Sequence, residues 1–118
     1  MLPLMALLFA LGGLARADEP DHVRGLLYRL DAEAHTVRLH PEQAWGEAQA
    51  VQRQAGDAAD SLQAQGMVGE AVALRRESDA LAQAARRNEP EDVRAHAITI
   101  ERLVRAVDER LPPHDIAR

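Results

Sequence analysis

The side chains best suited to chemistry near neutral pH are five histidines, His22, His35, His40, His96 and His114. Imidazole titrates in this range and binds haem iron and transition-metal ions. Two histidines four residues apart would place both rings on one helical face, as in zinc proteases, but no His-x-x-x-His pair occurs. None of the five histidines therefore belongs to a recognised ligand motif.

Helical geometry favours His96 among these candidates. At about 100° per residue, its ring falls beside Val93, Ala97 and Ile100, whereas His35 lies well off the apolar positions of its own segment. In a bundle of antiparallel helices, His35 and His96 would lie close to the same end. We therefore predict a candidate haem or metal site formed by His96 with His35 or His40.

Such a site would hold haem b or a transition-metal ion. It would resemble soluble periplasmic b-type cytochromes in architecture, since these are four-helix bundles with an axial histidine and methionine. A haem pocket needs room, however, and the predicted core consists mainly of small aliphatic side chains. The competing interpretation of His96 is a partly buried histidine at the edge of the core.

Other reaction chemistry finds little support in the sequence. The chain has no cysteine, which excludes disulfides, thiolate metal sites and cysteine nucleophiles. Ser61 and Ser78 lack the context of a nucleophile elbow, and no glycine-rich phosphate loop occurs. The formal net charge is −5 and no basic face is apparent, so no nucleic-acid partner is expected. We expect a protein that is not an enzyme.

The first seventeen residues predict a cleavable signal peptide. Residues 2–11 are apolar apart from one proline, and Ala15-Arg16-Ala17 offers small side chains at the two positions that a signal peptidase reads. The apolar run is shorter than the roughly 20 residues needed to cross a bilayer, so no stable membrane anchor is expected after cleavage. We predict a cut after Ala17, a periplasmic location and a single mature domain over residues 18–118.

The elements that must position the histidines are four amphipathic helices. Four segments have apolar residues spaced alternately three and four apart, and proline, glycine or asparagine separates the segments. The predicted helices cover residues about 21–39, 42–65, 67–88 and 91–111. Because short connections force neighbouring helices to run in opposite directions, we predict an all-α, antiparallel up-down-up-down four-helix bundle.

Two alternatives accompany this fold. Residues 25–30 and 35–39 also resemble two strands around a turn at Asp31-Ala32-Glu33, so residues 24–39 form either a helix or a β-hairpin. The chain has one Trp and one Tyr, and this shortage of bulky aromatic anchors favours association into a homodimer.

Taken together, these patterns predict an exported small helical-bundle protein that binds a protein or a small ligand and does not catalyse a reaction. The alternative is a haem or metal-ion carrier of the four-helix-bundle type that uses His96 with His35 or His40. Ile98 lies opposite the apolar stripe of its segment and marks a candidate contact surface.

Overall fold

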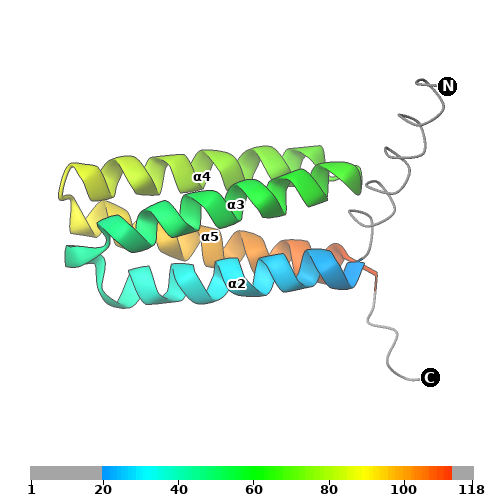
Figure 1. The fold of residues 1–118 in the computed structure, drawn as a ribbon, viewed down its shortest axis with the longest axis horizontal. Helices are drawn as coiled ribbons and strands as arrows, with labels where there is room; N and C mark the ends of the chain where they lie inside the picture. Colours follow the sequence, from blue (N-terminus) through cyan, green and yellow to red (C-terminus); the bar gives the residue numbers. More distant parts are fainter. Residues whose placement is uncertain (1–19, 113–118) are drawn as a thin grey trace, which may run out of the picture.

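The fold is seen in a computed structural model that describes residues 20–112, and this part of the chain is helical with no β-strand. Within these residues, four α-helices and one 3-10 turn follow one another (Figure 1): α2 (Pro20–Leu39), the 3-10 turn η1 (Pro41–Gln43), α3 (Trp45–Ala64), α4 (Val68–Arg86) and α5 (Pro90–Arg110). The all-helical prediction is confirmed for this part. The predicted signal peptide lies outside the described residues.

Residues 24–39 form a helix, so the β-hairpin alternative is wrong. Helix α2 runs without interruption from Pro20 to Leu39 and buries one stripe, Val23, Leu27, Leu30, Ala34 and Val37. In a hairpin, the alternation of side chains would place consecutive residues on opposite faces. The spacing of three and four residues instead brings all five side chains to one helical face.

The four α-helices pack side by side in a bundle-like fold (Figure 1). Helix α2 lies against α3 and α5, and α4 lies against the same two helices. The core contains the apolar stripes of all four, and its largest fully buried side chains are leucines and Ile100. Burying each such side chain contributes roughly 1.5 to 3 kcal/mol before the loss of conformational entropy is subtracted.

Two of the helices end in the same hydrogen-bonded arrangement. After α3, the N–H of Gly66 donates to the carbonyl of Gln63 at 3.0 Å, and the N–H of Met67 donates to Leu62 at 2.9 Å. Gly66 has a φ of +84°, which is the left-handed conformation that this Schellman motif requires. After α4, Asn88 takes the corresponding place with a φ of +54°. These two residues stop the helices and reverse the chain.

Helix α3 begins later than the predicted residue 42. Residues Pro41–Gln43 form a 3-10 turn, and the first α-helical residue is Trp45. Side chains three residues apart eclipse in a 3-10 turn, and Pro41 and Ala44 are both buried. The tighter turn therefore lets the connection between α2 and α3 contribute to the core.

Candidate functional site

A buried carboxylate lies where α2 and α5 meet. Glu101 follows Ile100 in α5, and its side chain is only 6% exposed. One of its oxygens, Oε1, accepts a hydrogen bond from Nε of Arg38 at 2.7 Å. Arg38 comes from the last turn of α2, where a basic side chain also complements the negative end of the helix dipole. The pair joins the two helices by a hydrogen-bonded ion pair.

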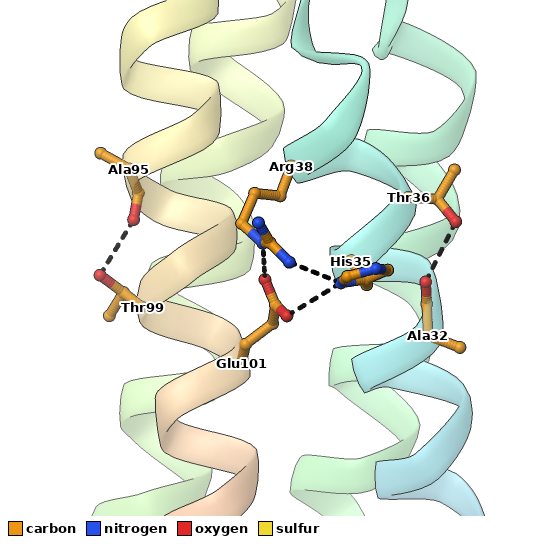
Figure 2. Close-up of polar contacts among 7 residues, drawn as sticks. All are labelled: Ala32, His35, Thr36, Arg38, Ala95, Thr99 and Glu101. Carbon is orange, nitrogen blue, oxygen red and sulfur yellow. Dashed lines mark hydrogen bonds and ion pairs between the residues drawn. The ribbon is translucent and has the colours of Figure 1, made fainter.

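His35 completes this cluster from one turn earlier in α2. Its Nδ1 lies 2.7 Å from Nη2 of Arg38 and 3.4 Å from Oε2 of Glu101, as Figure 2 shows. A guanidinium group can only donate, so Nδ1 accepts from Arg38 and cannot at the same time donate to Glu101. Arg38 is thus held through two of its three nitrogens, one bonded to Glu101 and the other to His35.

A pocket of about 290 Å³ opens beside this cluster. Its lining consists of Arg38, Ile98, Glu101, Arg102 and Arg105. Within residues 20–112, neither Arg102 nor Arg105 has an ion-pair partner. We call these five residues the arginine pocket. Guanidinium groups keep their charge at all physiological pH values and match the geometry of oxyanions, so the pocket has the chemistry of an anion site.

A larger groove of about 500 Å³ continues along the same pair of helices and shares Arg105 with the arginine pocket. We call it the α2–α5 groove. It is lined by both apolar and charged side chains: Asp21, Arg24, Gly25, Leu27, Tyr28, Asp31, Val104, Arg105 and Asp108. The Tyr28 side chain is 78% exposed, whereas Leu27 and Val104 are buried. Gly25 has no atom within 4 Å of the place that a Cβ would occupy.

Arg24 and Asp31, which line the α2–α5 groove, each contain a buried polar atom without a hydrogen-bond partner among residues 20–112. Nε of Arg24 donates to Asp108 at 3.0 Å, and Nη2 lies 3.4 Å from the carbonyl of Leu111. The remaining nitrogen, Nη1, and the Oδ1 atom of Asp31 are buried without a hydrogen-bond partner within residues 20–112. Such atoms are costly to leave unpaired, and both belong to residues that line the groove, although the atoms themselves are closed off from solvent.

The predicted histidine ligands lie on different pairs of helices. His96 is partly buried, and its Nδ1 lies 2.9 Å from Oε1 of Glu77 in α4. His35 instead contacts Glu101 between α2 and α5, and His40 is exposed after α2. Across residues 20–112, no group of three or more His, Cys, Asp or Glu side chains is placed to hold a metal ion. His22 is exposed, and His114 lies outside the described residues.

The sequence does not reveal the arginine pocket, because its charges resemble ordinary solvated residues. One signal of the cluster is local: His35 and Arg38 are three residues apart, a spacing that makes them neighbours on any helix. Glu101 carries no such signal, because its partner lies 63 residues away on another helix. Ile98, the apolar residue outside its stripe, lines the pocket in a half-buried position.

No protein-family model, curated protein or solved structure matches this chain. In the described part of the chain, none of the helices has the length and apolar character needed to span a membrane. The geometry of the site is therefore the basis for assigning a function.

Proposed function

We propose that this protein is an exported, non-catalytic binding protein whose α2–α5 groove holds a small molecule. The observation that carries the proposal is the groove itself, with a volume of about 500 Å³ and a mixed lining of buried leucine and valine, an exposed tyrosine and charged side chains. Small-molecule sites typically have volumes of about 300 to 1,000 Å³ and combine an apolar lining with a few polar groups.

Tyr28 and Gly25 line the α2–α5 groove, and their properties favour contact with a ligand over packing within the protein. An exposed tyrosine presents a large apolar ring and a polar hydroxyl, a combination that favours contact with ligands. Glycine in the middle of a helix costs roughly 0.5 to 1 kcal/mol relative to alanine, yet no neighbouring atom in the structure requires glycine at position 25. The groove is therefore open at this position, as is the surface of α3 at Gly56 outside the groove.

The antiparallel up-down-up-down topology is part of this proposal. Arg24 near the start of α2 pairs with Asp108 near the end of α5, whereas Arg38 near the end of α2 pairs with Glu101 further back in α5. The order of the pairs supports opposite directions for the two helices. Short connections between successive helices favour the same arrangement throughout the bundle.

Export is proposed from the N-terminal sequence, whose short apolar run and Ala15-Arg16-Ala17 fit a cleaved leader. The measurement is the intact mass of the protein recovered from the periplasmic fraction of a Gram-negative host. A mass equal to that of a chain beginning at Asp18 supports the proposal. Retention of the full chain in the cytoplasm contradicts it.

The binding proposal is tested by nuclear magnetic resonance on the labelled mature protein with the low-molecular-mass fraction of the periplasm. We expect shifts of the amide signals of Gly25 and Tyr28 in the wild type. Gly25→Leu fills the groove and abolishes them. Gly56→Leu is the matched control, because Gly56 in α3 also has open space at its Cβ position but does not line the groove. Equal loss of the amide shifts in both variants, or no shift in the wild type, contradicts the proposal.

A haem or metal-ion carrier is the alternative function, and one contact favours it. Glu77 holds one ring nitrogen of His96 at 2.9 Å, and a carboxylate on one nitrogen is the usual way to orient the other towards a metal. An absorption spectrum and elemental analysis of protein from its native compartment test this alternative. A Soret band or bound metal that His96→Ala removes supports a carrier, and a bare spectrum without metal contradicts it.

A further inference from the structure

We infer that the arginine pocket binds the phosphate group of a small organic phosphate, with the organic part lying in the adjoining α2–α5 groove. The inference rests on the proposed binding function and adds the chemical class of the ligand. A phosphate carries a charge of about −1.5 to −2 at neutral pH and three strong acceptor oxygens. The pocket offers three guanidinium groups against one carboxylate, which leaves a net charge of +2.

Arg38 is held in a fixed position by two hydrogen bonds. Its Nε donates to the buried Glu101 at 2.7 Å and its Nη2 donates to His35 at 2.7 Å, as Figure 2 shows. Its third nitrogen, Nη1, forms no hydrogen bond within residues 20–112. A guanidinium held in this way loses less rotational freedom when a ligand binds, so more of the interaction energy appears as affinity.

The other two arginines of the pocket form no ion pair within residues 20–112. Arg102 and Arg105 are three residues apart on α5, and among the described residues neither forms an ion pair. Three guanidinium groups around one pocket repel one another, and a bound dianion relieves this repulsion. The pocket is basic although the whole chain has a net charge of −5, so its charge is a local feature.

Apolar surfaces beside the arginines favour an organic phosphate over free phosphate. Ile98 supplies an apolar surface inside the arginine pocket, and Arg105 also lines the larger groove with its buried Leu27 and Val104. Free phosphate has no group that would use these surfaces. A phosphate monoester would place its oxygens on the arginines and its apolar part in the groove.

The experiment is a calorimetric titration of the mature protein with phenyl phosphate, inorganic phosphate and benzoate. We expect phenyl phosphate to bind most tightly, inorganic phosphate about tenfold or more weakly, and benzoate more weakly than phenyl phosphate. Inorganic phosphate binding as tightly as phenyl phosphate would assign the pocket to free phosphate and overturn the organic part of the inference. No binding of either phosphate overturns the inference as a whole.

Variants test the residues. Arg102→Gln and Arg105→Gln should each weaken phenyl phosphate binding about tenfold or more, because each removes a charged donor. Arg94→Gln is the matched control, since Arg94 is exposed on the same helix and lines none of the pockets described above. An equal loss in Arg94→Gln would mean that the phosphate responds only to overall charge, and this result would overturn the assignment. Circular dichroism checks that each variant is folded.

Glu101→Gln tests whether Glu101 affects phosphate binding by positioning Arg38 or only through its own negative charge. Removing a negative charge from the pocket should, by electrostatics alone, strengthen phosphate binding. If Glu101 acts as a positioning residue for Arg38, binding weakens instead, and Glu109→Gln on the exposed part of α5 does not reproduce this weakening. Tighter binding in Glu101→Gln would overturn the role given to Arg38.

The outcome also separates this inference from the proposed function. If Gly25→Leu abolishes the response to the native small-molecule fraction and neither phosphate binds, the groove function stands and the phosphate assignment fails. If phenyl phosphate binds through Arg102 and Arg105 but Gly25→Leu changes neither its affinity nor the response to the native fraction, the phosphate site on the arginines stands, whereas the groove function and the placement of the organic part in the groove both fail.

Discussion

The carboxylate of Glu101 lies inside the bundle and accepts a 2.7 Å hydrogen bond from Nε of Arg38, a residue 63 positions earlier in the chain. Arg38 is partly exposed, with 32% of its side chain accessible, whereas the Glu101 side chain is 6% exposed. The pair therefore joins a buried acceptor to a donor at the surface. This difference in exposure determines how much stability is lost when either side chain is replaced.

Glu101→Gln should lower the free energy of unfolding by about 1 to 2 kcal/mol, because the acceptor of the Arg38 hydrogen bond loses its negative charge and the amide NH2 group is buried in place of a carboxylate oxygen. The estimate lies below that for a fully buried ion pair because solvent screens the partly exposed Arg38. Urea denaturation provides the measurement. Glu109→Gln on the exposed face should change stability by less than about 0.5 kcal/mol. Equal effects of the two variants would contradict a structural role for Glu101.

Leu74→Ala should be among the more damaging single substitutions in the core. Leu74 is fully buried in α4, and removing its side chain combines lost burial with a cavity, at a cost of about 2 to 5 kcal/mol. Val72→Ala on the same helix is the control, because Val72 is 45% exposed. Thermal and urea unfolding should show a clearly larger loss of stability for Leu74→Ala than for Val72→Ala. A loss for Leu74→Ala no greater than that for Val72→Ala would mean that α4 does not pack as described.

Two glycine substitutions should have effects of opposite sign. Gly25→Ala adds a methyl group to open space within α2 and should stabilise the protein by about 0.5 to 1 kcal/mol. Gly66→Ala should destabilise it by about 1 to 2 kcal/mol, because φ at that position is +84° and a Cβ is strained there. Melting temperatures measured in one buffer would show this contrast. A gain of stability in Gly66→Ala would contradict the left-handed helix end.

The pKa of Glu89 lies above its ordinary value, which predicts a pH dependence. A side-chain hydrogen bond with Asp92 is the main cause, followed by desolvation and the negative charge of Asp92, while Arg87 acts in the opposite direction. Because the folded state binds the proton more tightly, stability falls as pH rises from the ordinary pKa of a glutamate through the raised one.

Glu89→Gln should remove this dependence. From about pH 4 to pH 7, the melting temperature of the variant should rise relative to that of the wild type. The reason is that the raised pKa of Glu89 costs stability in this window only in the wild type. Glu91→Gln, next to the same helix start, is the control because it leaves the Glu89 and Asp92 contact intact. Parallel pH profiles of the wild type and Glu89→Gln would contradict the contact with Asp92.

The all-helical fold and much of the core could be predicted from the sequence alone. The positions Val23, Leu27 and Leu30 of α2 repeat at the helical period, and they are buried in the structure. Gly66 and Asn88 could likewise be recognised as helix ends, because few other residues adopt the left-handed conformation readily. The error at the start of α3 has a local cause, since Pro41 suits the first turn of a 3-10 helix as well as that of an α-helix.

The site depends on relationships that no local pattern encodes. Helical periodicity assigns each residue to a face of its own helix, but the rotation and the register of two packed helices decide which faces meet. Those two quantities bring Arg38 to Glu101 and place Arg102 and Arg105 beside them. They also direct His96 towards Glu77 on α4 and leave His35 between α2 and α5. The sequence by itself therefore determined the helices and their buried stripes, whereas only the packing of the helices decided which charged side chains meet.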